Sequence, residues 1–258
     1  MAPSGRQGEK RIGEVSVTSS RRVKAILLAG IAGILLSGVP ARGAESAAPA
    51  MPSDVYPESG NRLPLVKREE MSDADKKIFD EIMQKQQGGY KSRGEERPSV
   101  RMHSPGLAKG MAEVHHYLKY ETGLEPRTME IAILTTSREL TNQYEWTQWV
   151  EHASDPKDPR HIDPKIVDAI LWCKPLTGLA EKDAAVIRLG RETFGARKVS
   201  KKTFADVLRI YGRRNTVDMI ELMALYGATG AELTAFDMQL NAGQKPLLPA
   251  QIKTSCGK

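Results

Sequence analysis

The sequence feature that most constrains the fold is a helix-start signal that recurs along the chain, in which a capping residue or a proline precedes apolar residues spaced three and four apart. Ser72 and Ser104-Pro105 are two examples, and Thr141 is the expected cap of a later helix. Serine, threonine and aspartate accept hydrogen bonds from the free amides of a first helical turn, and proline fits its first position. A glycine-rich, charged loop over 88–98 separates the first two signals. Together they predict helices that begin at Ser72 and Ser104, followed by helices over 126–138, 141–153, 163–173, 180–193, 200–211 and 215–240.

No strand is predicted, because no segment alternates apolar and polar residues as a half-buried strand does. We therefore predict an all-α protein, a helical bundle over 72–245 followed by a C-terminal tail over 246–258. Gly227 and Gly230 are candidate breaks in the last helix. Residues 47–71 are rich in Pro, Ser and Ala and are predicted to form an extended arm.

The N-terminal region has the order of a secretory signal peptide. The basic residues Arg21, Arg22 and Lys24 precede a nearly unbroken apolar run over 25–39, and small residues follow it. This run is shorter than the roughly 20 residues that span a bilayer, so no stable membrane anchor is expected. Residues 1–46 are therefore predicted to be a signal peptide and leader, and the protein to be periplasmic or secreted.

The net positive charge of the chain is concentrated in this leader. Residues 1–44 carry seven Lys or Arg against Glu9 and Glu14, so five of the six net charges lie there. The remainder is close to neutral, whereas binding to nucleic acid depends on positive charges that neutralise phosphates. We therefore expect no nucleic-acid partner.

The chain contains two cysteines, Cys173 and Cys256. An oxidising compartment permits them to form a disulfide, but their spacing does not decide whether they do. Cys173 follows the apolar stretch 169–172, which favours a buried, small hydrophobic residue. The pairing is left open by the sequence.

A polar and aromatic stretch over 141–152 stands where a core helix would be aliphatic. Spacings of four and three residues place Glu145, Trp149 and His152 on one helix face within about two turns. A carboxylate next to an indole in a closed site has its charged form disfavoured, which suits it to acid or base duty. The stretch therefore predicts a proton-transfer site. Alternatively, Glu145 pairs with a cation on a neighbouring helix and His152 is an ordinary exposed residue.

Two motifs carry a resemblance to a known family. Arg127-x-x-Glu130, followed by Asn142-x-Tyr144-Glu145-Trp146, resembles the carboxymuconolactone decarboxylase family over roughly residues 96–240. The resemblance implies a helical bundle of the alkyl hydroperoxidase D type that assembles into trimers or hexamers. It also implies a cofactor-free lyase or isomerase that acts on a small organic acid or lactone.

The peroxidase branch of this superfamily uses a Cys-x-x-Cys pair and a following His. In this chain Asn142 and Glu145 occupy the two cysteine positions, and Trp149 occupies the histidine position. Reduction of a peroxide by this route needs a thiolate nucleophile. A peroxiredoxin-like activity, working through Cys173, is therefore the less favoured alternative.

The candidate site is defined by these motifs and by the shared helix face. The candidate residues are Glu145 as acid or base, Glu130, His152 and Tyr144 as supporting groups, and Trp149, Trp146 and Arg127 for substrate binding. Simpler roles remain open, because Arg127 and Glu130 are spaced as a helix-face ion pair and the two tryptophans suit a core or a subunit interface. The third functional alternative is a non-catalytic oligomeric binding module. No metal or cofactor is expected, since no His-x-x-x-His or clustered acidic pattern lies near the site.

Overall fold

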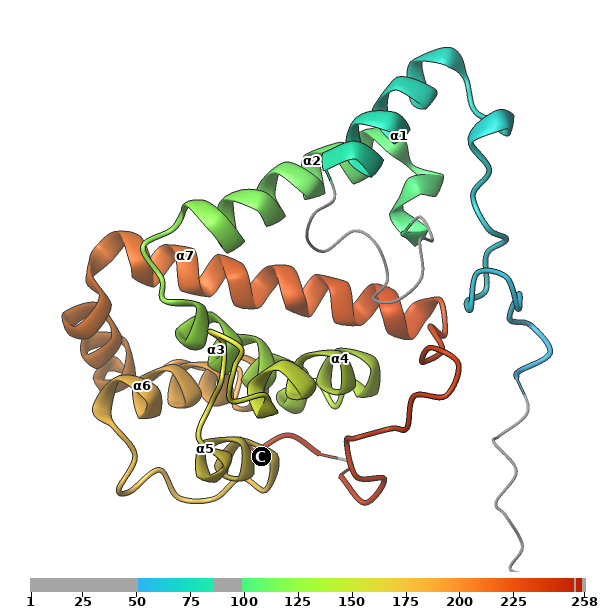
Figure 1. Ribbon diagram of the computed structural model, residues 1–258. Helices are drawn as coiled ribbons and strands as arrows, with labels where there is room; N and C mark the ends of the chain where they lie inside the picture. The colour runs from blue at the N-terminus through green and yellow to red at the C-terminus, as the bar shows by residue number, and fades with distance from the viewer. Residues whose placement is uncertain (1–50, 86–98, 253, 257–258) are drawn as a thin grey trace, which may run out of the picture. The chain divides into compact units, whose positions relative to one another are not determined.

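The computed structural model describes residues 51–85, 99–252 and 254–256, which all lie in one compact unit, Pro49–Lys258. Over these residues the protein is mostly helical and has no strand, only an isolated bridge between Tyr56 and Asn61, so the all-α prediction is confirmed. The predicted signal peptide and the loop over 88–98 lie outside the described residues. The helices are α1 (Asp73–Lys85), α2 (Pro105–His116), α3 (Pro126–Glu139), α4 (Gln143–Ser154), α5 (Pro164–Leu171), α6 (Glu181–Gly190) and α7 (Lys201–Ala235) (Figure 1).

Several helices begin where the local signals predict. The Ser72 hydroxyl accepts a hydrogen bond from the Asp75 amide at 3.1 Å, and Asp163 caps α5 through the Lys165 amide at 2.9 Å. The fourth start is one residue later than predicted. Asn142, not Thr141, caps α4, because its side-chain oxygen accepts from the Glu145 amide at 2.8 Å, whereas Thr141 adopts a left-handed conformation with φ 51°.

The gap predicted between the helices over 200–211 and 215–240 is confirmed, but the further breaks expected at Gly227 and Gly230 do not occur. Gly212, with φ 73°, interrupts α7, while Gly227 and Gly230 continue the helix. A Cβ on Gly227 would lie 3.3 Å from the Phe194 ring, and one on Gly230 would lie 3.3 Å from the Asn142 amide. These two glycines therefore allow close packing and do not break the helix.

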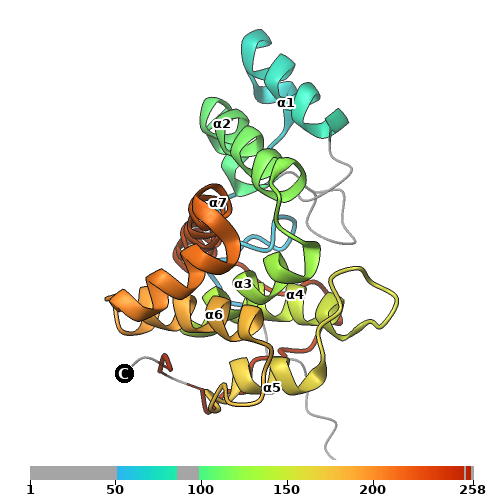
Figure 2. The ribbon, with the colours of Figure 1, turned by 90° about the vertical axis from the view of Figure 1, so that its left-hand side faces the viewer.

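Helix α3 is the centre of the main core. All its residues from Thr128 to Glu139 are buried, and it packs against α4, α5, α6 and α7. Both views show α3 between α7 and α5 (Figure 1 and Figure 2). The main core, called here the α3 core, contains large apolar side chains that include Ile131, Trp146, Ile187 and Leu222. A helix buried on all sides is set in place by its neighbours, which fixes the position of α4 against it.

Helices α1 and α2 pack on each other around a second, much smaller core. Its buried residues are Ile82, Met102 and Ala108, and partly buried residues such as Phe79 pack against them. The π-helical turn η3 (Tyr117–Glu121) continues α2 toward α3. This pair, called here the α1–α2 hairpin, is thus built on a core separate from the α3 core.

The segment predicted as an extended arm makes specific contacts with the end of α7. The Arg62 amide donates to the Phe236 carbonyl at 2.9 Å, and the Gln239 amide donates to the Gly60 carbonyl at 2.8 Å. Val55 is buried. This part of the chain therefore packs in turns against the residues that follow α7.

A disulfide joins Cys173, just after α5, to Cys256 in the C-terminal tail. Cys173 is therefore a half-exposed bridging residue, not the buried thiol expected, and it follows α5 with φ 55°. Arg138 donates to the Thr254 carbonyl at 2.8 Å, and the Cys256 amide donates to Glu139 at 2.9 Å. The end of the tail is thus attached to α3 as well as to the segment after α5.

Candidate functional site

Two of the residues predicted to share a face of α4 are directly bonded. The Trp149 indole donates a hydrogen bond to Glu145 Oε2 at 2.6 Å, and Glu145 is only 5 % exposed. This contact follows from the four-residue spacing, since α4 begins at the Asn142 cap and Glu145 lies in its first turn. A buried carboxylate with an N–H donor is the central feature of the candidate site.

His152 lies next to this pair and contacts the loop that follows α4. Its ring centroid is 5.9 Å from that of Trp149, and its Nδ1 lies 2.9 Å from Asp158 Oδ2 and 2.7 Å from Arg160 Nη2. The Nε2 atom of His152 is buried and has no hydrogen-bond partner among the described residues. The contacts at Nδ1 orient the ring and leave Nε2 for another group.

The Trp149 ring is surrounded by side chains from three other elements. Tyr226 of α7 packs edge-on against it with centroids 5.2 Å apart. The Lys119 ammonium of η3 lies 4.5 Å from the ring centroid, and the Arg160 guanidinium lies 6.0 Å from it. Both cations lie within the range of a cation–π contact, so positive charge flanks the indole.

Two partly buried groups in this region, Arg160 and His115, have shifted pKa values. Burial alone would lower the pKa of Arg160, but the hydrogen bond to Asp158 and the charges of Glu130 and Asp158 outweigh it and hold that pKa above its ordinary value. Burial, together with the charges of Lys119 and Arg101, lowers the pKa of His115 to about 4. Burial first, and these cations second, therefore disfavour the protonated form of His115.

Glu130 and Arg127 do not form the helix-face pair that their spacing permits. Arg127 instead binds Asp183 of α6 through two hydrogen bonds of 2.6 and 2.9 Å. Asp183 is 3 % exposed, so this is an ion pair that joins α3 to α6. Glu130 is fully buried and interacts with the charge of Arg160. The structure thus places Glu130 within electrostatic reach of Arg160, and places Arg127 in an ion pair with α6.

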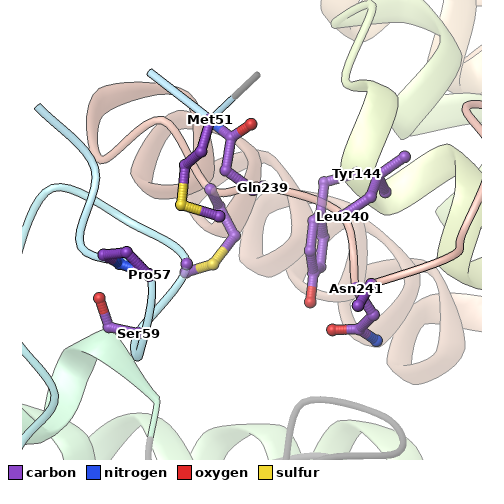
Figure 3. A pocket seen from close by; sticks show the side chains of 10 residues that line it. Met51, Pro57, Ser59, Tyr144, Gln239, Leu240 and Asn241 are labelled. Carbon is purple, nitrogen blue, oxygen red and sulfur yellow. The ribbon is translucent and has the colours of Figure 1, made fainter. Parts of the chain in front are cut away.

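Trp146 and Tyr144 also lie away from the Glu145–Trp149 pair. Trp146 is 1 % exposed and belongs to the α3 core. Tyr144 lines a separate pocket of about 140 Å³ (Figure 3). Its other walls come from the segment 51–60 and from the residues after α7: Met51, Pro57, Ser59, Gly60, Met238, Gln239, Leu240, Asn241 and Ala242. Drug-sized ligands occupy roughly 300–1,000 Å³, so this pocket is small.

The structure adds residues that the sequence reasoning did not select. They are Lys119, Asp158, Arg160 and Tyr226. Asp158 and Arg160 lie in an irregular loop, where no periodic pattern reveals which way a side chain points. Lys119 lies in a π-helical turn, a feature that often occurs at functional sites. The contact of Tyr226 with Trp149 depends on the packing of α7.

The described residues contain neither a metal-binding cluster nor a membrane-spanning helix. Across 51–85, 99–252 and 254–256 no group of three or more His, Cys, Asp or Glu is arranged to hold a metal ion. Nor does this part of the chain contain a helix both long and apolar enough to cross a membrane. The residues that meet at α4 are thus carboxylates, cations, an imidazole and aromatic rings.

Comparison of the chain with protein-family models and with curated protein sequences finds no match.

Proposed function

We propose that this chain is an exported enzyme that transfers protons on a small organic acid or lactone without a cofactor, with Glu145 as the acid or base. The proposal includes a bundle of the alkyl hydroperoxidase D type, a periplasmic or secreted location after removal of a signal peptide, and assembly into a trimer or hexamer. The observation that supports it most is the buried Glu145–Trp149 hydrogen bond, with the Arg160 guanidinium and the His152 imidazole next to the indole ring.

The proposed proton transfer depends on two opposing effects on the pKa of a buried carboxyl group. Burial disfavours the charged form of a carboxyl group, and an N–H donor favours it. A group held between these influences is suited to accept and return a proton during a reaction. Glu145 has both features, because it is 5 % exposed and accepts from Trp149 Nε1.

His152 supplies a second group for proton transfer. Asp158 and Arg160 fix one side of its ring, in the way that a neighbouring carboxylate orients a catalytic imidazole. Its Nε2 is buried and has no hydrogen-bond partner among the described residues, so it is the ring nitrogen that the contacts at Nδ1 leave for proton transfer. We propose that His152 supports Glu145 by holding or moving a proton at Nε2.

The charges around Trp149 favour an anionic substrate. Lys119 and Arg160 lie against the indole ring, and a carboxylate is attracted to such a pair of cations. Glu130 supplies a compensating negative charge behind Arg160. This arrangement supports the small organic acid more directly than an uncharged lactone.

The peroxidase alternative is not supported by the position of the cysteines. Both form the Cys173–Cys256 disulfide, whereas the positions equivalent to the peroxidase thiols carry Asn142 and Glu145 on α4. Reduction of a peroxide at α4 would need a thiolate there. We therefore do not propose this activity.

The test is proton exchange and turnover with a panel of small carboxylic acids and lactones. Exchange of carbon-bound hydrogen in D₂O, followed by NMR, detects proton transfer even where no net product forms. We expect Glu145→Gln to lower the rate at least 100-fold, in line with the contribution of a general acid or base. Glu151→Gln, which changes an exposed carboxylate on the same helix, is the matched control and is expected to retain full activity.

Two results would reject the proposal: full activity of Glu145→Gln, or no exchange and no turnover by the wild-type chain over the whole panel. In the second case the non-catalytic oligomeric module becomes the better interpretation. That alternative predicts that Trp149→Ala separates the subunits, which size-exclusion chromatography with light scattering detects. A catalytic role for the site predicts an intact assembly without activity.

A further inference from the structure

The turn that leads into α7 carries exposed basic side chains and an exposed aromatic ring. Arg197, Lys198 and Lys201 are exposed, and Phe204 keeps 47 % of its surface exposed. We call these four residues the basic–aromatic patch. An exposed phenylalanine that follows three exposed cations within eight residues of sequence is an unusual use of a large apolar side chain, which folding normally buries.

The backbone under the patch is held in place. The Lys198 amide donates to the Glu192 carbonyl at 2.9 Å, and Val199 packs against the α3 core. Ser200 caps α7 through the Thr203 amide at 3.2 Å. The exposure of the four side chains is therefore a property of a built turn and not of a loose end.

Helical geometry places Phe204 with Lys201 and away from the nearest acidic residue of the helix. Thr203 and Val207 face inward and are buried. Successive residues turn by about 100°, so Phe204 and Lys201 share a side while Asp206 lies on the other side. Asp206 is bonded there to Lys202 at 2.7 Å. The patch thus keeps Lys201 and the ring together without that carboxylate.

The acidic residue on the other side of the turn is also engaged. Glu192 accepts hydrogen bonds from the Ser200 amide at 2.6 Å and from the Thr203 hydroxyl at 2.7 Å. The sequence contains no acidic residue between Glu192 and Asp206. The charges of Arg197, Lys198 and Lys201 are therefore presented to the surroundings.

We infer that the basic–aromatic patch binds the surface of an anionic phospholipid bilayer. Basic residues near such a surface each contribute roughly a fivefold gain in binding, and an aromatic ring between them enters the interfacial layer. The patch lies on the turn before α7 and in the first turn of α7, and all four side chains are exposed there. This inference does not depend on the chemistry of Glu145.

The experiment is co-sedimentation of the full chain with vesicles of phosphatidylcholine alone or with 30 % phosphatidylglycerol. We expect tighter binding to the anionic vesicles, lost in 0.5 M NaCl because salt screens exposed charges. The triple variant R197Q/K198Q/K201Q is expected to weaken this binding about 100-fold, and Phe204→Ala about fivefold. The charge-matched control K157Q/K165Q/K245Q changes three other exposed lysines and is expected to bind like the wild type.

The leader is the same in every variant, so it contributes equally to all of them. The inference is overturned if R197Q/K198Q/K201Q binds anionic vesicles as the wild type does, or if the control variant loses as much binding. A polyglutamate peptide provides the other comparison. Patch-dependent binding to that peptide without binding to vesicles would assign the patch to an acidic protein and overturn the bilayer assignment.

Discussion

The α3 core and the α1–α2 hairpin show two ways in which the same all-helical sequence is stabilised. The α3 core brings together large side chains from α3, α4, α6 and α7, many of them fully buried. The hairpin core has three buried residues, Ile82, Met102 and Ala108. Since stability follows the apolar surface removed from water, the hairpin is expected to open at a lower free energy than the rest of the bundle.

The two regions also differ in the disulfide, hydrogen bonds and ion pairs that stabilise them. The disulfide and the contacts of Arg138 and Glu139 attach the tail to the bundle, and a tail amide, that of Leu247, donates to Thr147 of α4 at 3.1 Å. The hairpin relies more on ion pairs at the surface, such as Lys109–Glu81 at 3.6 Å. Surface pairs of this kind contribute little, about 0–1 kcal/mol.

The largest expected effect comes from removal of the disulfide. The double variant C173S/C256S opens a link across 83 residues, which is expected to lower the free energy of unfolding by about 4 kcal/mol. Urea denaturation measures the loss, and hydrogen exchange locates it. We expect faster exchange in the tail and in α5, with the α1–α2 hairpin unchanged. A loss below about 1 kcal/mol would show that the noncovalent contacts of the tail suffice.

The comparison is sharpened by the same substitution in each core. Ile187→Ala in the α3 core is expected to cost about 3 kcal/mol and to lower Tm by roughly 6–12 °C. Ile82→Ala in the hairpin core is expected to cost about 2 kcal/mol locally, with little change in the Tm of the bundle. Calorimetry and hydrogen exchange distinguish the two. An equal fall in Tm for both variants would mean that the two cores unfold as one unit.

The sequence predicts contacts between residues that are close along the chain better than contacts between residues that are distant along it. Ser72 caps its helix as predicted, and the helix predicted over 163–173 begins at the Asp163 cap, because a cap needs only the next two or three amides. The break at Gly212 falls in the gap predicted between the helices over 200–211 and 215–240. The breaks expected at Gly227 and Gly230 were wrong, since only the approach of Phe194 and Asn142 reveals why those glycines are present.

The candidate site shows the same difference between contacts within one helix and contacts between separate elements. The Glu145–Trp149 contact is a four-residue spacing on one helix, so the sequence predicts it. Arg127, predicted to bind substrate, has its partner 56 residues away in Asp183, and the alternative pair with Glu130 does not form. Lys119 and Arg160 reach Trp149 from other elements, and no spacing along the chain indicates such a meeting.

The smallest of the three effects concerns the junction between the hairpin and the rest of the bundle, where His115 of α2 lies near Lys119 and Arg101. Burial and these cations lower its folded-state pKa to about 4, from 6.5 in the unfolded chain. Below pH 6.5 the unfolded chain therefore binds a proton that the folded protein excludes. His115 thus makes stability fall between about pH 6.5 and pH 4, by about 2 kcal/mol after allowance for partial solvent access, with no further loss below pH 4.

His115→Gln removes this titration, so the difference in unfolding free energy between the variant and the wild type is expected to change by that amount across the interval. His116→Gln is the matched control, because His116 is exposed and neighbours the same position in the sequence. Urea denaturation from pH 7 to pH 4 measures both variants, and hydrogen exchange shows whether the loss falls on α2. A wild-type curve that stays parallel to that of His115→Gln would mean that His115 does not exclude its proton in the folded state. The hairpin would then differ from the α3 core in packing alone and not in its response to pH.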